Sequence, residues 1–487
     1  MPGQEHKQEA SLNGIRGQLS GFGDLEDKSL TVPAGQVSLL YIKSVTDGQA
    51  ISRNIIAPFY EMGNPAGYYS YIADYPGSEV VTEGPRAVEL LLSGYACIGW
   101  QDKLCFFDVL RAEASSVKET VTESISQGPS DALGENLAVN LNLIRRRYQS
   151  AALKMEFTVI GNMSKTKAAI LYDEDRVNPE VLAELKEKLD SLKLDILQAA
   201  GELEKYISSD KLRIFPKTIV TERPDRVVFN LAEGKVAILL DTTGYAIVLP
   251  SIFNDFFIAM DDKIQLPFVG RFLKLLRIVG VAMTLWLPAL YIAFTSYNPE
   301  IVRVQIALLI GGSRATVPYP SFVEVILMMI MMEFLTEASL RLPRAIGPTA
   351  TTVGGLILGQ AATAAGLIGN IMIILVSVVA ISNFLVPLNM MSFSIRVLKY
   401  FFVIAAAFLG LVGVVICLVG FTLYLCSQRS FGQPYFKLFF LDTIGTSLKK
   451  KGGTMMAKSR YFYCLFLMNS LINIINFTPP GAARYPL

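Results

Sequence analysis

The sequence contains few of the residues that build catalytic and metal sites. Its 487 residues include a single histidine, His6, and five cysteines. No two cysteines stand in a Cys-x-x-Cys spacing, so a metal site of Cys and His ligands is not expected. The scarcity of histidine also argues against a Ser-His or Cys-His nucleophile pair. We therefore expect neither an enzyme nor a protein with a metal or another cofactor.

The N-terminal segment also lacks an apolar run of the kind that forms the core of a signal peptide. Residues 1–30 are mostly polar. We therefore expect the N-terminal half of the chain to stay in the cytosol. Paired cysteines are not expected in that compartment.

Acidic residues are scarce in the second half of the chain. Residues 1–262 contain 37 acidic and 26 basic residues, whereas residues 263–487 contain 5 and 18. The basic residues of the second half separate apolar runs and do not cluster, which argues against nucleic-acid binding. This pattern is typical of a soluble domain followed by a membrane domain with cationic loops.

Charge is absent from residues 345–395, a stretch of 51 positions. A membrane span needs about 20 apolar residues, so this stretch can cross a bilayer once with long flanks, or twice with a turn near residues 366–370. Further spans are predicted over Ile278–Phe294, Phe322–Leu340 and Phe401–Cys426. We expect about four spans in total, and between four and six are possible.

The soluble half alternates between strand and helix periodicity, which predicts two small α/β subdomains. Strands are predicted over Val37–Ile42, Ala96–Trp100 and Leu104–Val109, and a hairpin over Val227–Leu231 and Val236–Leu240. The fold class is therefore mixed, a cytosolic α/β region followed by an α-helical transmembrane bundle. The predicted domains are a flexible tail (1–34), two soluble subdomains (35–115 and 116–262), a transmembrane domain (263–430) and a cytosolic C-terminal tail (431–487).

A helix is predicted within residues 126–148, with Ser130 or Asp131 as its cap. Three consecutive arginines, Arg145, Arg146 and Arg147, close it, where cations suit the negative end of the helix dipole. They are either a solvated helix end or a contact for a partner or for anionic lipid.

A second charged cluster lies in a predicted loop between two apolar strands. It consists of Glu222, Arg223, Asp225 and Arg226. The two carboxylates could form an acid/base couple, but no histidine, metal signature or glycine-rich phosphate loop accompanies them. We interpret the cluster as an ion-pair network at a domain or subunit interface.

Three carboxylates, Glu324, Glu333 and Glu337, fall in or beside the second predicted span. Ionisable residues inside a membrane are functional candidates by default, and a ring of carboxylates from several subunits favours cations. The alternative for Glu337 is an ion pair with Arg341, one helical turn later. Arg341 and Arg344 return the chain to the cytosolic side and are candidates for coupling.

Small residues dominate the following helix, Val353–Gly366. Small residues let membrane helices approach closely, so this helix either packs tightly in a bundle or lines a pore in a symmetric oligomer. The candidate pore or gate residues are Ile357, Leu358, Gly359, Gln360, Ala362, Thr363 and Gly366.

Three long motifs carry a resemblance to a known family. They are GPSDALGENLAVNLNLIRRR (128–147), TERPDRVVFNLAEGKVAILLDTTGYAIVLP (221–250) and EASLRLPRAIGPTATTVGGLILGQAATAAG (337–366). With these motifs the chain resembles the A subunits of GerA-type spore germination receptors over almost everything after residue 35. The related SpoVAF branch shares this architecture.

The resemblance implies a subunit of the inner spore membrane that works with a transporter-like B subunit and a lipoprotein C subunit. It also implies a homo-oligomer, suspected to be a pentamer, that conducts monovalent cations across the bilayer when germination starts. Two other functions are considered, a component of a secondary transporter and a non-conducting scaffold that couples the cytosolic domains to a separate receptor.

Overall fold

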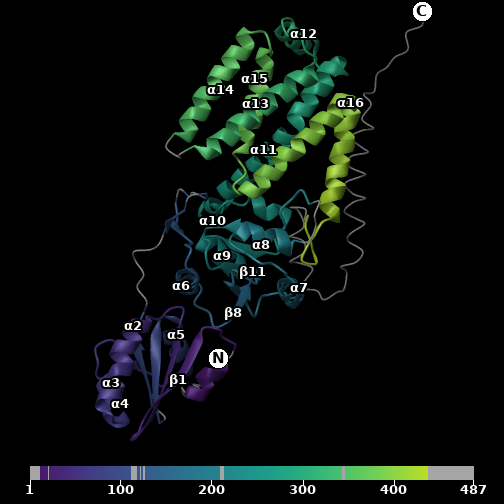
Figure 1. Ribbon diagram of the computed structural model, residues 1–487. Helices are drawn as coiled ribbons and strands as arrows, with labels where there is room; N and C mark the ends of the chain where they lie inside the picture. Colours follow the sequence, from purple (N-terminus) through teal and green to yellow (C-terminus); the bar gives the residue numbers. More distant parts are fainter. Residues whose placement is uncertain are drawn as a thin grey trace, which may run out of the picture. The chain divides into compact units, whose positions relative to one another are not determined.

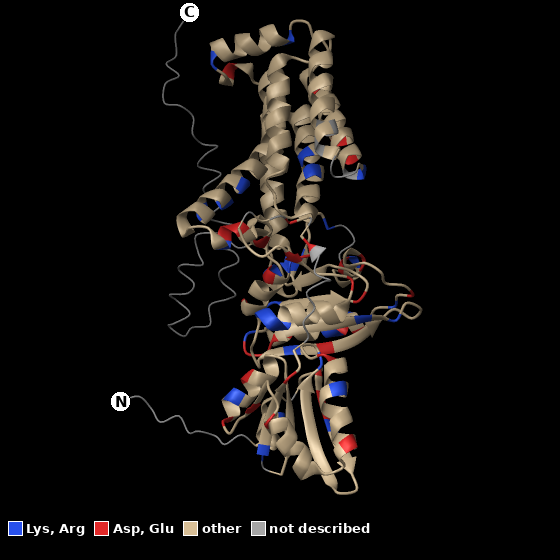
Figure 2. Ribbon diagram, turned by 90° about the vertical axis from the view of Figure 1, so that its left-hand side faces the viewer, with Lys and Arg blue, Asp and Glu red and all other residues tan. Residues whose placement is uncertain are grey.

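The computed structural model describes residues 11–436, apart from residues 20, 102, 111–117, 121, 124, 126, 209–212 and 343–345. The chain separates into two compact units. The first, the soluble unit, holds residues up to 251 together with 258–274 and 430–432. The second, the helical unit, holds residues 252–257, 275–429 and those from 433 onward. Charged side chains are dense in the soluble unit and sparse in the helical unit (Figure 2).

The first sheet of the soluble unit has five antiparallel strands in the order β1-β2-β4-β5-β3. They are β1 (Leu25–Val32), β2 (Gly35–Ile42), β3 (Ser78–Val80), β4 (Tyr95–Trp100) and β5 (Lys103–Asp108). The helices of this region are α1 (Leu12–Gln18), α2 (Gly48–Ile51), a π-helical turn (Ser52–Ile56), α3 (Ala57–Met62), α4 (Pro65–Ala73) and α5 (Gly84–Leu92).

Both faces of this sheet are covered, because the side chains of each strand alternate between two cores. Leu40 and Ile42 of β2 pack with residues of α1 and α5. Leu39 and Tyr41 of the same strand pack with residues of α3 and α4. The first subdomain is therefore a three-layer arrangement of helices, sheet and helices.

The second sheet also has five antiparallel strands, in the order β10-β12-β11-β9-β8. They are β8 (Leu153–Ile160), β9 (Thr166–Asp173), β10 (Ile219–Thr221), β11 (Val236–Leu240) and β12 (Ala246–Leu249). Helices α6 (Leu137–Arg147) and α9 (Pro224–Ala232) contact each other and this sheet. Helices α7 (Pro179–Asp190) and α8 (Ala200–Ile207) contribute to its other core. A short ribbon of β6 (Lys118–Glu119) and β7 (Asp131–Ala132) precedes α6.

The structure corrects the predicted N-terminal tail from residue 12 onward. Ser11 caps α1 by accepting the Gly14 N–H, and β1 pairs with β2 along its whole length. Ile15 of α1 and Leu19, the residue that caps its C-terminal end, are buried. Apolar residues are few in this polar stretch, which explains why composition alone indicated a tail. The described part of the predicted tail thus belongs to the first subdomain.

Two other local predictions in the soluble half were wrong. Helix α6 begins after Asn136, whose side chain accepts the N–H groups of Ala138 and Val139. Asp131 lies in β7 and not at the helix cap. Residues 227–231 form part of helix α9 and not a strand, because Pro224 starts the helix and Val227 and Leu231 bury one face of it. The hairpin in this region is β11 with β12.

The soluble unit and the helical unit share the segment that follows β12. It contains a 3₁₀ turn (Phe253–Phe257) and α10 (Met260–Ile264). The remaining helices are α11 (Pro267–Ser296), a 3₁₀ turn (Pro299–Ile301), α12 (Val304–Arg314), α13 (Ser321–Arg341), α14 (Gly347–Ala364), α15 (Asn370–Asn383) and α16 (Asn389–Ser427). A small ribbon of β13 (Arg429–Ser430) and β14 (Gln433–Pro434) follows α16.

Helix α16 is two arms joined at a sharp break, visible in Figure 1. Gly410 has φ 59° and ψ −139°, outside the helical region. The Sγ of Cys417 lies 3.8 Å from the carbonyl oxygen of Phe401, and the rings of Phe402 and Phe421 are 6.3 Å apart. The second arm therefore folds back on the first. The span predicted over Phe401–Cys426 lies within α16, which is long and apolar enough to cross a membrane, and the turn at Gly410 falls inside it.

Among the described residues, α11 and α16 are long and apolar enough to cross a membrane by length and composition. Shorter apolar helices cover Thr352–Ala364 and Asn370–Asn383. The chain between α14 and α15 turns at Gly366, which has φ 65°. This turn corresponds to the two-helix alternative for the uncharged stretch.

Candidate functional site

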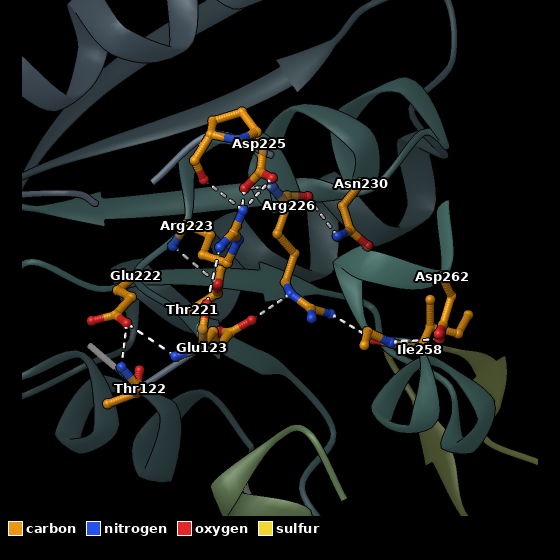
Figure 3. A network of polar contacts seen from close by, with 12 residues as sticks. Thr122, Glu123, Thr221, Glu222, Arg223, Asp225, Arg226, Asn230, Ile258 and Asp262 are labelled. Carbon is orange, nitrogen blue, oxygen red and sulfur yellow. Dashed lines mark hydrogen bonds and ion pairs between the residues drawn. The ribbon is translucent and has the colours of Figure 1, made fainter. Parts of the chain in front are cut away.

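Arg223 is the centre of a buried ionic network in the second subdomain (Figure 3). It directly precedes α9, and its side chain is 1% exposed. Its guanidinium makes two bonds to Asp225, in the first turn of α9, with Nη2 2.7 Å from Oδ2 and Nε 3.0 Å from Oδ1. It also donates to the carbonyls of Glu123 and Pro129, each at 3.0 Å. A planar guanidinium suits such a multiply bonded, buried position better than an ammonium does.

Arg226, also in the first turn of α9, extends the network toward the start of α11. Its Nε lies 2.8 Å from Oε2 of Glu123, and its Nη1 donates to the carbonyl of Ile258 at 3.2 Å. Asp262 accepts the N–H of Ala259 next to that carbonyl. Arg226 therefore joins the segment between the two sheets to the residues that lead into α11.

Glu222 fastens the same segment through backbone groups. One oxygen of its carboxylate accepts a hydrogen bond from the N–H of Thr122 and another, at 3.1 Å, from the N–H of Glu123. The backbone carbonyl of Glu222 accepts the N–H of Leu133. Both carboxylates of the cluster are thus engaged by hydrogen bonds, an arrangement suited to holding a loop. Among the residues that the structure describes, no group of three His, Cys, Asp or Glu could hold a metal ion.

The three arginines at the end of α6 have three different environments. Arg145 is completely buried and pairs with Asp24 of the first subdomain, with Nη2 3.3 Å from Oδ1. It also donates to the carbonyl of Leu153 at 2.9 Å. Arg147 pairs with Asp131, and Arg146 is exposed. Of the two readings of this cluster, the solvated helix end describes Arg146 alone.

Arg145 joins the two subdomains at a closely packed contact. Its guanidinium carbon lies 4.7 Å from the ring centroid of Phe22, and Asp24 also accepts the hydroxyl of Ser44. Burial lowers the pKa of Arg145, and the neighbouring Asp24 opposes that shift. Removing Asp24 would leave a buried charge without its partner, which is strongly destabilising.

In the helical unit, Glu324 of α13 is completely buried and joins three helices. Its Oε1 accepts the N–H of Gly369, the cap residue of α15, at 2.7 Å. Its Oε2 lies 3.2 Å from Nε of Arg314, at the end of α12. A carboxylate at a helix N-terminus is favoured by the helix dipole. This contact fixes α12, α13 and α15 together.

Glu333, also on α13, pairs with two cations of α16. One oxygen lies 2.7 Å from Nζ of Lys399, and the other accepts the Nε–H of Arg396 at 2.9 Å. Lys399 is almost fully buried. The three residues form a triad with one negative and two positive charges, which holds α13 against the first arm of α16.

Glu337, one turn later on α13, is exposed and pairs with Arg341 at 3.0 Å. This is the ion pair that was considered as the alternative role for Glu337. Arg344 lies outside the described residues. Each of Glu324, Glu333 and Glu337 therefore has its own cationic partner.

Helix α14 packs one face on α13 and exposes the other. The Cβ positions of Gly354 and Gly355 face Leu335 of α13. Ile357 is 60% exposed and Gln360 is exposed, whereas Leu358, Gly359, Ala362, Thr363 and Gly366 are half-buried. Thr363 satisfies its hydroxyl within the helix by donating to the carbonyls of Gly359 and Gln360. The exposed face carries both apolar and polar side chains.

The sequence reasoning missed the partners of these residues. They are Asp24, Glu123, Arg314, Arg396 and Lys399. Their charge beside long apolar stretches was the available signal for Arg396 and Lys399. The other partners lie in unremarkable polar segments.

Comparisons with known proteins agree with the family resemblance that the three sequence motifs carry. Residues 13–451 match the family described as Bacillus/Clostridium GerA spore germination protein. The spore germination protein GerLA of Bacillus cereus is 34% identical over 432 residues, which are 86% of this chain and 88% of that protein. The spore germination protein B1 of Bacillus subtilis is 32% identical over 422 residues, 85% of this chain and 86% of that protein.

A solved structure was also matched, the N-terminal domain of the A subunit of the Bacillus megaterium spore germinant receptor GerK3. It is 21% identical, covers 50% of this chain and 98% of that domain, and superposes with a TM-score of 0.39. The family match extends over most of the chain and includes all three motifs identified above. The chain therefore belongs to the GerA family of spore germination proteins.

Proposed function

We propose that this chain is the A subunit of a nutrient receptor in the inner membrane of bacterial spores. In this role it assembles as a homo-oligomer, for which a pentamer is the suspected form, and conducts monovalent cations at the start of germination. The observation that carries the proposal is the 34% identity to GerLA over 86% of this chain and 88% of that protein. A transporter-like B subunit and a lipoprotein C subunit are the proposed partners.

The helical unit is the proposed membrane domain. Apart from α11 and α16, its apolar helices are short or carry charge, so a bundle of about four spans remains a proposal. Arg271, Lys274 and Arg277 near the start of α11 support a cytosolic soluble unit, since cationic residues flank the cytosolic ends of spans. The predicted domain boundaries at residues 116, 263 and 431 also stay predictions.

Helix α14 is the proposed wall of the ion path. The carboxylates Glu324, Glu333 and Glu337 are all paired, which makes a ring of free carboxylates less suitable for this role. The exposed face of α14 carries Ile357 and Gln360, and it is available to neighbouring subunits around an axis. A narrow apolar constriction can stop ions by dewetting.

Substitutions in α14 test the proposal. Leu358→Ala and Ile357→Ser make the helix smaller or more polar, so they should release potassium from spores without nutrient. Gly359→Leu should instead block assembly or conduction. Potassium efflux is measured in spores that contain the complete complex, and immunoblots of the spore membrane measure the complex level. If none of these variants leaks while the complex level is normal, α14 is not the wall of the path.

A secondary-transporter component is the second candidate, favoured by the break in α16 at Gly410. Transporters often place binding sites at interrupted helices. A transporter role predicts saturable uptake of a solute that competes with the nutrient, whereas a channel predicts passive efflux down a gradient. Proteoliposomes that contain the purified complex distinguish the two roles.

A further inference from the structure

The turn directly after α16 has an unusual backbone. In the ribbon of β13 and β14, both central residues have positive φ, 45° at Phe431 and 71° at Gly432. This is the pattern of a type I′ turn, which normally contains Asn, Asp or Gly. A bulky residue such as phenylalanine in this conformation costs about 1–2 kcal/mol. Another contact of Phe431 must offset that cost.

The ring of Phe431 supplies this contact, because it is buried in the core of the second subdomain. It is 6% exposed and belongs to the cluster that contains Leu185 and Leu189 of α7. The ammonium of Lys188 lies 4.4 Å from its ring centroid, a favourable cation–π distance. The neighbouring Ser430 donates its hydroxyl to the carbonyl of Lys217 at 2.9 Å. These contacts all lie within the soluble unit.

The connection between α16 and this buried ring is short. Helix α16 ends at Ser427, four residues before Phe431. Four residues of fully extended chain span about 14 Å at most. A larger displacement of the end of α16 would therefore either pull the ring out of the core or move the subdomain with it.

We propose that Phe431 is a positioning residue that fastens the C-terminal end of α16 to the second subdomain. The inference rests on the proposed function, since it assigns the route by which the soluble unit controls the membrane helices. The anchored ring makes the position of α16 sensitive to the packing of α7 and of the second sheet. The C-terminal end of α16 is then under the control of the same subdomain that holds the Arg223 network.

A longer connection between α16 and Phe431 tests this proposed fastening, the tether, in the full complex. Three residues, Gly-Ser-Gly, are inserted between Ser427 and Gln428, which leaves Phe431 and its contacts unchanged. The control has the same insertion between Gly63 and Asn64, two exposed residues at the junction of α3 and α4. Complex level, thermal unfolding and nutrient-triggered potassium release are measured in both variants.

The insertion after Ser427 should reduce the initial rate of potassium release about fivefold or more, with normal complex level and thermal unfolding. The control should behave as the unmodified protein. Equal release in the two variants, whether normal or reduced, overturns the tether. A purely structural role of Phe431 predicts no effect of the insertion, because the docked ring stays in place.

Substitutions of the ring decide the question if the insertion prevents assembly. Phe431→Ala should lose the nutrient response, and Phe431→Leu, which refills the core, should restore most of it. Equal responses of these two variants contradict the proposal. Leu358→Ala is measured in parallel, because nutrient-independent leak there reports on the ion path itself. A leak in Leu358→Ala with a normal response in Phe431→Ala overturns the tether and leaves the proposed function intact.

Discussion

The two buried or half-buried carboxylates of the helical unit differ in the number of cations that they face. Glu333 faces both Arg396 and Lys399, so one carboxylate is shared by two cations and one positive charge is left over. Glu324 has one cationic partner, Arg314, and one backbone donor. Breaking a buried pair by removing one partner costs more than removing the pair, because the remaining charge is uncompensated. The consequence of a substitution therefore depends on which charge is left behind.

This imbalance predicts an asymmetry between two substitutions in the triad. Glu333→Ala leaves the buried Lys399 and the half-buried Arg396 without a counter-charge and should destabilise the helical unit by about 3–5 kcal/mol. Lys399→Met keeps the packing of the side-chain stem and leaves Glu333 paired with Arg396, so it should cost below about 1.5 kcal/mol. Thermal unfolding of the purified protein in detergent measures both. Equal destabilisation by the two variants would show that the triad does not act through charge.

The buried cysteines of the first sheet predict a loss of stability at alkaline pH. Burial raises the pKa of the Cys97 thiol from 9.0 to about 12, and that of Cys105 to about 11. A raised pKa in the folded state means that the stabilisation is complete below pH 9 and is lost as the pH rises from 9 toward 12. Denaturant unfolding at a series of pH values measures this loss.

The control for this prediction is Cys97→Val, which keeps an apolar side chain and removes the thiol. Its stability should fall less steeply between pH 9 and 12 than that of the unmodified protein. The difference between the two slopes therefore reports on the Cys97 thiol together with its electrostatic effect on Tyr69. Identical slopes would contradict a neutral, buried Cys97.

Among the helices and strands, α16 shows how a single glycine changes an element. Its 39 residues are apolar enough for a long span, yet Gly410 turns the chain back. A Cβ at this position would lie 2.7 Å from Cγ of Tyr297, at the boundary of α11, and would need positive φ. The Tyr297 hydroxyl donates to the carbonyl of Ala407, three residues before the break. The side chain from α11 thus supports the turn.

Chemical cross-linking distinguishes the folded α16 from a straight helix. Phe402 and Phe421 have ring centroids 6.3 Å apart, whereas a continuous helix would separate these positions by about 28 Å. With Cys417, Cys426 and Cys464 replaced by serine, Phe402→Cys and Phe421→Cys should cross-link within one chain through a short bifunctional thiol reagent. Mass spectrometry of the proteolysed protein detects the linked peptides. Their absence in a folded, labelled protein would contradict the turn at Gly410.

At the scale of the whole molecule, strands with regular alternation were predictable. β2, β4 and β5 were confirmed to within one or two residues, because each sends alternate side chains into two cores. Helix α9 was mistaken for a strand, because a five-residue window with apolar residues 227 and 231 suits both periods. The triad in the helical unit was out of reach, since Glu333 and Arg396 are 63 residues apart and only the tertiary fold pairs them.

Removal of the residues before the predicted boundary at residue 35 should have a measurable effect on the stability of the soluble unit. The boundary at residue 35 would remove Ile15, Leu19 and Phe22 of one core and Leu30 of the other, all of which are buried. Burial of each such side chain contributes about 1.5–3 kcal/mol, and a whole domain is stable by only about 5–15 kcal/mol. A fragment of residues 35–262 should therefore be unfolded or marginally stable.

A fragment of residues 11–274 retains these core residues, so it should unfold cooperatively at a clearly higher temperature. Both fragments lack Phe431, which makes the comparison independent of the tether. Far-ultraviolet circular dichroism during heating measures the two transitions. Equal melting temperatures would mean that α1 and β1 contribute nothing to the fold, and the boundary at residue 35 would then stand. A higher transition for residues 11–274 places the start of the first subdomain at α1, since the added core residues are then the source of the gain.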